Sequence, residues 1–252
     1  MEQTSEFIKN KQKLEVEIER IKKIRSERKT INILGISSSS VNSDDKIVRV
    51  PSSEKILLET LELAKSIDSN VDTQVFKLRD IKYLPCEANY SIQSEYCTWP
   101  CWISQRYPET DGLIPVYKAI VEWADIVLIA TPIRWGNPSS HYFKFIERLN
   151  CIENQKEVYG LNIIEDQQAG FIIVGAQDGV QHTLGEMMTF WTQQGFSFSK
   201  YPYVGYTSGN YTNTNTKNVQ EQIVKDREVI NKMQTEMLTN QIESVKRTRK
   251  II

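Results

Sequence analysis

No apolar stretch in this 252-residue chain approaches the roughly 20 residues that a membrane span requires. Two common nucleotide-binding patterns, G-x-G-x-x-G and G-x-x-x-x-G-K-[S/T], are also missing. The formal net charge is −1, so no large basic face for nucleic acid is expected. The lack of a long apolar stretch predicts that the chain does not span a membrane, and the near-zero charge predicts that nucleic acid is not its main partner.

Cysteine is scarce, with four residues, and the N-terminal residues have the pattern of a charged helix rather than a signal peptide. Thiols in such a chain are expected to be reduced, which predicts a cytoplasmic protein. Cys86, Cys97 and Cys101 lie in one segment, separated by ten and three residues. We favour packed free thiols and assign no metal ligand. A redox-active thiol pair stays open, as does a metal or iron–sulfur site, for which Cys151 is a poor fourth ligand.

Apolar runs without polar alternation recur along the chain, and helical patterns separate them. Such runs are typical of parallel strands that are covered on both faces. The order predicts an α/β fold with a doubly wound, five-stranded parallel sheet. The strands are predicted at 30–37, 71–78, 125–131, 169–176 and 201–207. The helices are predicted at 53–67, 113–124, 138–149, 183–196 and 217–247, and the long segment 83–112 is expected to be irregular.

Extra helices flank the sheet domain, which is expected to span residues 30–208. Residues 1–29 are predicted to form a helical arm, and residues 209–252 a polar linker followed by a C-terminal helix. A narrow apolar seam runs along the arm at Phe7, Leu14, Ile18 and Ile21. The seam suits packing either on its own domain or on another subunit. Because a lone helix of this kind is marginal in water, we expect a homodimer or homotetramer.

Three polar loops follow predicted strands at the edge where a doubly wound sheet places its ligands. The loop 37–53 is rich in serine, Ser52 or Ser53 is expected to cap the next helix, and such a helix N-terminus suits a phosphate. The loop 131–137, "TPIRWGN", suits a flat ligand with polar edges. The loop 175–182, "GAQDGVQH", has two glycines that permit close backbone approach. Together the loops predict one ligand crevice.

The same loops resemble a known family. The stretches "ILGISSSS" and "PSSEKILL" are similar to the first strand, phosphate loop and first helix of the NAD(P)H-dependent FMN reductases. The block "VYKAIVEWADIVLIATPIRWGNPSSHYFKFIERL" resembles the central block of that family, in the version of the flavodoxin-like NAD(P)H:quinone oxidoreductases. The stretch "GAQDGVQHTLGEMMTFWTQQGF" resembles its third flavin loop.

The resemblance implies a flavodoxin-like fold that binds FMN. The implied phosphate ligands are Ser37, Ser39 and Ser53. The implied isoalloxazine contacts are Pro132, Ile133, Arg134, Trp135, Gly136 and Asn137. The implied third loop around the flavin consists of Ala176, Gln177, Asp178 and Gly179. The first loop departs from the family pattern, because Val41 stands where an arginine is common and the loop is several residues longer.

The resemblance also implies an activity, that of an NAD(P)H-dependent FMN oxidoreductase. NADPH or NADH would deliver hydride to flavin N5, and a quinone, a nitroaromatic compound or a flavin would accept the electrons. No side chain is a certain catalytic residue, although Arg134 and His182 are candidates for tuning the flavin. Two alternatives stay open. One is an electron-transfer flavoprotein, with or without a cysteine-bound iron–sulfur cluster, and the other is a non-enzymatic flavodoxin-like scaffold.

Overall fold

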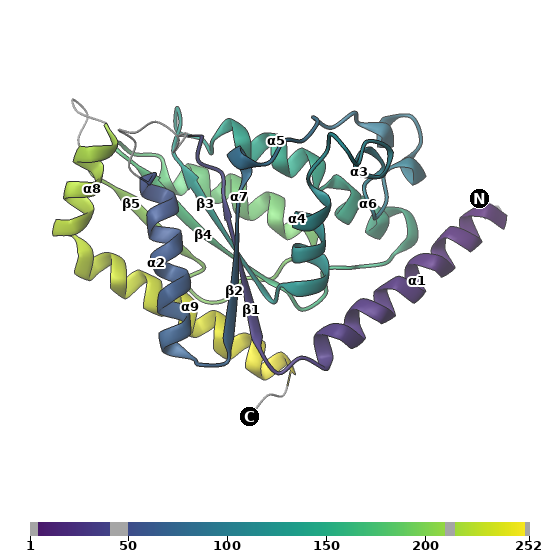
Figure 1. The fold of residues 1–252 in the computed structure, drawn as a ribbon, viewed down its shortest axis with the longest axis horizontal. Helices are drawn as coiled ribbons and strands as arrows, with labels where there is room; N and C mark the ends of the chain where they lie inside the picture. Colours follow the sequence, from purple (N-terminus) through teal and green to yellow (C-terminus); the bar gives the residue numbers. More distant parts are fainter. Residues whose placement is uncertain (1–4, 41–49, 210–214, 250–252) are drawn as a thin grey trace.

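The computed structural model describes residues 5–40, 50–209 and 215–249, and Figure 1 shows their arrangement. Five parallel strands form one sheet in the order β2-β1-β3-β4-β5. This is the flavodoxin-like strand order, so the predicted doubly wound, five-stranded parallel sheet is confirmed. The strands are β1 (Ile31–Ser37), β2 (Val71–Lys77), β3 (Ile126–Pro132), β4 (Gln168–Gly175) and β5 (Tyr203–Thr207).

The central strands are buried on both faces, which explains why their sequences are apolar without alternation. In β1, Ile31 and Ile33 belong to one hydrophobic core, whereas Leu34 and Ile36 belong to the other. Every residue of β3 up to Thr131 is buried. Two hydrophobic cores therefore form, one on each face of the sheet.

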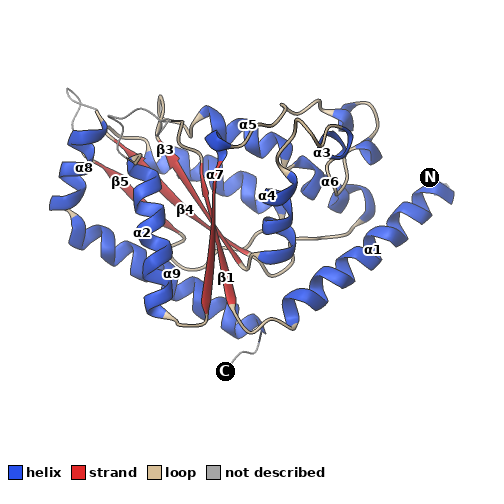
Figure 2. Cartoon of the chain, viewed as in Figure 1, coloured by secondary structure: helices blue, strands red, loops and turns tan. Residues whose placement is uncertain are grey.

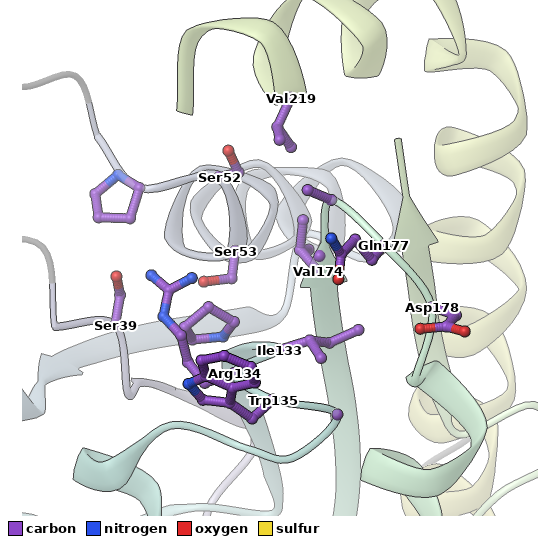
Figure 3. Close-up of a pocket in the computed structure, with 15 residues that line it drawn as sticks. Ser39, Ser52, Ser53, Ile133, Arg134, Trp135, Val174, Gln177, Asp178 and Val219 are labelled. Atoms are coloured by element: carbon purple, nitrogen blue, oxygen red, sulfur yellow. The ribbon is translucent and has the colours of Figure 1, made fainter. Parts of the chain in front are cut away.

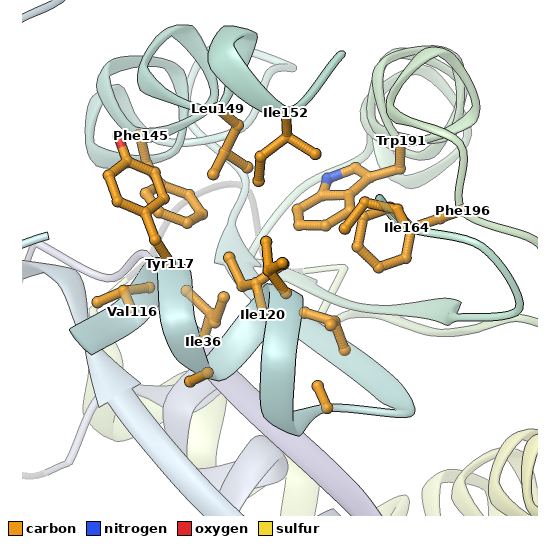
Figure 4. Close-up of a cluster of buried hydrophobic side chains, with 14 of the residues drawn as sticks. Ile36, Val116, Tyr117, Ile120, Phe145, Leu149, Ile152, Ile164, Trp191 and Phe196 are labelled. Atoms are coloured by element: carbon orange, nitrogen blue, oxygen red, sulfur yellow. The ribbon is translucent and has the colours of Figure 1, made fainter. Parts of the chain in front are cut away.

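Helices cover both faces (Figure 1, Figure 2). The helices on the first face are α2 (Ser52–Ile67), α8 (Thr216–Lys225) and α9 (Arg227–Arg249). Those on the second face are α4 (Ile114–Lys118), its π-helical continuation η4 (Ala119–Trp123), α5 (Ser140–Arg148), α6 (Asn150–Tyr159) and α7 (Val180–Gln194). On this second face, Tyr117, Phe145 and Trp191 are among the side chains that fill the core (Figure 4). None of the helices described is long and apolar enough to cross a membrane.

The N-terminal arm, α1 (Ser5–Ser26), packs against its own domain (Figure 1). Leu14 and Ile21 of the seam are buried there, and the rings of Phe7 and Tyr159 lie 4.9 Å apart between centroids. Of the two docking alternatives, the structure shows the intramolecular one. The seam therefore does not require a second subunit. The homodimer or homotetramer stays a prediction, which light scattering would test.

Two helical regions differ from the sequence-based prediction. The predicted helix 217–247 is divided into α8 and α9, with Asp226 between them. The Asp226 carboxylate accepts a hydrogen bond of 2.8 Å from the Tyr206 hydroxyl, and this bond ties the break to β5. Helix α6 was not predicted, because it follows α5 without any turn residue. It ends at Gly160, whose φ of 69° lies in the left-handed region that glycine favours.

The segment 83–112 is ordered by one buried side chain, Arg148 at the end of α5. Arg148 donates hydrogen bonds to both carboxylate oxygens of Asp111, at 2.7 and 3.0 Å. It also donates to the Leu84 carbonyl at 2.6 Å and to the Ser104 hydroxyl at 2.9 Å. A buried ion pair therefore fixes this segment, in keeping with the rule that so long a loop is either functional or ordered by other contacts. The short helical pieces within it are η2 (Asn89–Ser91), η3 (Ser94–Tyr96) and α3 (Trp102–Arg106); η1 (Leu78–Asp80) precedes it.

Candidate active site

A cavity of about 360 Å³ lies at the carboxyl ends of β1, β3 and β4 (Figure 3). A doubly wound sheet places its ligands at this edge, and the size suits a small molecule. All three polar loops reach the cavity. The implied flavin residues that line it are Ser39, Ser53, Pro132, Ile133, Arg134, Trp135, Gly136, Ala176, Gln177 and Asp178. The lining residues that the resemblance did not indicate are Pro51, Ser52, Val174, Gly175 and Val219.

The first turn of α2 offers the cavity a polar group that lacks a partner. Ser53 is only 2 % exposed, and its Oγ has no hydrogen-bond partner in the described part of the chain. The N-cap of α2 is Pro51, and no side chain caps the helix. The expectation that Ser52 or Ser53 caps α2 is therefore wrong, since both lie inside the helix. A buried hydroxyl without a partner beside an uncapped helix N-terminus fits an anion such as a phosphate.

Ser37 does not line the cavity, because its hydroxyl is bound to a buried carboxylate. It donates a hydrogen bond of 3.0 Å to Glu54, which also pairs with Arg79 and with Lys77. Burial alone would raise the pKa of Glu54, but the hydrogen bonds from Arg79 and Lys77 outweigh burial and hold the pKa below its usual value. The charge of Glu54 is therefore offset by these cations, and the Ser37 hydroxyl is directed at Glu54 rather than into the cavity. The Ser37 Oγ in turn accepts a hydrogen bond from the backbone N–H of Ser39 at 3.4 Å.

The loop after β3 is a tight hairpin that holds a tryptophan in an unusual backbone conformation. The N–H groups and carbonyls of Arg134 and Asn137 bond reciprocally at 2.7 and 2.9 Å. Between them, Trp135 and Gly136 have φ values of 53° and 77°, as in a type I′ turn. The turn is held in place because Thr183 donates a hydrogen bond of 3.1 Å to the Gly136 carbonyl.

The Trp135 side chain is fully exposed although it lines the cavity. A bulky residue in the left-handed region costs on the order of 1–3 kcal/mol, and such strain is concentrated at functional sites. The backbone of Trp135 is also held within the hairpin, since the Asn137 side chain donates a hydrogen bond of 2.9 Å to the Trp135 carbonyl. The fold therefore presents an indole to solvent on a well-anchored turn.

The loop after β4 lies close to this hairpin. A Cβ on Gly175 would approach Ile133 to 2.9 Å, so glycine there allows Ile133 to lie against the end of β4. Gly179 is the N-cap residue of α7, has a φ of 103° and does not line the cavity. His182 also lies outside the lining and is exposed, with its Nε2 3.3 Å from the Asn137 amide oxygen. His182 thus contacts the end of the 131–137 loop through Asn137, and neither residue lines the cavity.

The cysteines lie away from this cavity. All four are free thiols, and Arg148 donates a hydrogen bond of 3.4 Å to the sulfur of Cys101. Within residues 5–40, 50–209 and 215–249, no group of three or more metal-binding side chains is arranged to hold a metal ion. No disulfide joins the thiols among the described residues, and the redox-active pair stays an untested alternative to the packed free thiols that we favour.

The comparisons with known proteins agree with this geometry. The family model described as NADPH-dependent FMN reductase matches residues 31–207, about 70 % of the chain. No curated protein matches the sequence significantly.

Several solved structures share the fold. RosB, solved with the bound intermediate 8-demethyl-8-formylriboflavin 5′-phosphate, is 17 % identical, with a TM-score of 0.66; the match covers 88 % of this chain and 81 % of RosB. An azoreductase from Bacillus anthracis str. Sterne is 12 % identical, with a TM-score of 0.51 and coverage of 88 % and 100 %. An NAD(P)H:quinone oxidoreductase from Methanothermobacter marburgensis is 11 % identical, with a TM-score of 0.51 and coverage of 80 % and 94 %. At these identities, the likeness shows a shared fold.

Proposed function

This chain belongs to the NADPH-dependent FMN reductase family, and we propose that it transfers electrons from NAD(P)H to a quinone, a nitroaromatic compound or a free flavin. Membership makes it an NAD(P)H-dependent FMN oxidoreductase that acts on a small-molecule acceptor. FMN, when bound, would supply the redox chemistry, which is hydride acceptance from NAD(P)H and electron transfer to the acceptor. The acceptor class is the part that we propose.

The observation that carries the FMN site is the buried Ser53 hydroxyl, which faces the cavity without a partner among the described residues. With Ser39 and the first turn of α2, it forms a small polar region at one end of the cavity. A phosphate would satisfy both the hydroxyl and the free N–H groups of the helix. These residues therefore fit the phosphate of FMN.

The rest of the cavity suits a flat ring. Ile133 and Val174 give it apolar surface, and the backbone of the 134–136 turn borders it. Gln177 and Asp178 provide polar groups at the end that lies away from Ser53 (Figure 3). We propose that these groups orient the isoalloxazine, while the exposed Trp135 indole lies where a second planar molecule approaches.

The acceptor is tested by steady-state turnover. FMN-loaded protein should oxidise NADPH or NADH faster when a quinone, a nitroaromatic compound or free FMN is added. Oxidation that none of the three accelerates would contradict the proposed acceptor classes. An electron-transfer flavoprotein would hold FMN but would be reduced only slowly by either nicotinamide. A scaffold without cofactor would hold no FMN.

The same reaction tests whether the flavin is a catalyst. The mass of the flavin recovered after many turnovers should equal that of FMN. A changed mass would show that the flavin itself is the substrate, and the proposed reaction would be wrong.

A further inference from the structure

We propose that Arg134 binds the phosphate of FMN, and that it thereby makes the site selective for phosphorylated flavin. The inference rests on the proposed FMN site and assigns one residue a role in it. It differs from the role that the resemblance implies, in which Arg134 contacts the isoalloxazine ring.

The position of the guanidinium is the first argument. Figure 3 shows it at the end of the cavity where Ser39 and Ser53 lie, whereas Gln177 and Asp178 stand at the other end. Arg134 is the only cationic side chain among the described residues that line the cavity. The single cation among the described lining residues thus lies toward the same end of the cavity as the hydroxyls that fit a phosphate (Figure 3).

Charge balance is the second argument. The two cations next to the first turn of α2, Arg79 and Lys77, are paired with the buried Glu54. Arg79 also lies 3.5 Å from a carboxylate oxygen of Asp80, so these two cations face two carboxylates and leave no net positive charge for a ligand. Arg134 is exposed, and no carboxylate among the described residues pairs with it. Its charge is therefore available to a dianion.

Arginine chemistry is the third argument. A guanidinium presents a planar fork of donors that matches a phosphate with two parallel hydrogen bonds. The oxidised isoalloxazine is neutral and gives a cation much less to bind. The two placements of Arg134 therefore predict different ligand selectivity. At the phosphate, Arg134 strengthens the binding of FMN but not of riboflavin; at the ring, it affects both ligands alike.

The test measures the dissociation constants of FMN and riboflavin for the flavin-free protein, from the quenching of flavin fluorescence. In Arg134→Ala, we expect FMN to bind about 10- to 100-fold more weakly, which is the loss typical of a hydrogen bond to a charged group. Riboflavin should change by less than about twofold. Arg134→Lys should fall between wild type and Arg134→Ala for FMN, because it keeps the charge but loses the fork.

Two variants serve as controls. Lys200→Ala removes the same charge from an exposed residue that lies over the Tyr201 ring, outside the cavity lining, and should leave both constants unchanged. Arg49→Ala tests the cation that precedes α2 in the sequence, outside the described residues. An FMN-selective loss in Arg49→Ala with none in Arg134→Ala would overturn the proposal.

Other results would overturn it as well. An equal loss of FMN and riboflavin affinity in Arg134→Ala, with a lowered flavin reduction potential, would place Arg134 at the ring. Unchanged dissociation constants for both ligands in Arg134→Ala would show that the Arg134 side chain points into solvent and binds neither part of the flavin. If the wild-type protein bound neither ligand, the proposed function itself would fail, and that result is distinct from both of the others.

Discussion

Replacing Ser53 by alanine is expected to change the stability of the FMN-free and FMN-bound proteins in opposite directions. In the FMN-free protein, the Ser53 Oγ is buried without a hydrogen-bond partner in the described part of the chain. A buried hydroxyl in that state costs about 1–3 kcal/mol. Alanine removes this cost, although part of the gain is offset by lost packing. The free energy of unfolding of the FMN-free protein should therefore rise by about 1 kcal/mol.

FMN binding should weaken in the same variant. A hydrogen bond from Ser53 to the phosphate would be charge-assisted and worth about 1.5–3 kcal/mol. Since 1.4 kcal/mol is a factor of ten, the dissociation constant of FMN should rise about 10- to 100-fold. The stabilisation that excess FMN adds to the folded protein should shrink by the corresponding free energy.

Urea unfolding with and without excess FMN measures both effects. The matched control is Ser66→Ala at the opposite end of α2, where the hydroxyl is exposed and donates to the Leu63 carbonyl. It makes the same serine-to-alanine change within the same helix, away from the cavity. If Ser53→Ala destabilised the FMN-free protein and left FMN affinity unchanged, Ser53 would have no role at the phosphate.

Three other perturbations test different parts of the structure. Trp135→Asn keeps the left-handed turn, which asparagine favours, so stability should hold within about 0.5 kcal/mol. The KM for a planar quinone should rise several-fold while that for ferricyanide does not, because stacking on the indole is lost; equal changes for both acceptors would contradict this. Asp111→Asn should lower the free energy of unfolding in urea by about 3–5 kcal/mol, since it leaves Arg148 buried and unpaired; a change below about 1 kcal/mol would refute the role of the pair. Burial alone would raise the pKa of Asp111, but hydrogen bonds from Arg148 and Ser104 outweigh burial and lower the pKa. The ionised Asp111 carboxylate therefore stabilises the folded protein fully above the unfolded pKa of about 3.9. This stabilisation is lost as the pH falls through the lower folded pKa. The urea midpoint should therefore fall below about pH 4, and the fall should be smaller in Asp111→Asn.

Sequence reasoning succeeded where local pattern and fold agree. Strands β1, β3 and β4 were predictable because their apolar runs have no polar alternation, which is typical of a sheet covered on both faces, whereas β2 at the edge was predictable from its alternation. The end of α7 was predictable for a local reason, since Gly195 adopts a φ of 101°. The three loops at the carboxyl ends of the strands followed from the topology alone.

The parts that could not be predicted depend on contacts between distant residues. Val219 lines the cavity only because α8 packs beside α2, where the Gln220 side chain donates a hydrogen bond of 2.5 Å to the Val50 carbonyl. In the sequence, Ser37 looks like a phosphate ligand. In the fold, its hydroxyl donates a hydrogen bond to the Glu54 carboxylate instead. The position of the Arg134 side chain is likewise a property of the folded cavity, and no spacing rule predicts it.

The central claim is that this chain holds FMN and accepts electrons from a reduced nicotinamide. The most direct test is to mix the FMN-loaded protein with NADPH, and separately with NADH, in the absence of oxygen and to follow the visible flavin absorption. We expect the band to bleach rapidly with at least one of the two and to return when a quinone is added. A band that persists with both nicotinamides, or a protein that retains no flavin after reconstitution, would contradict the account.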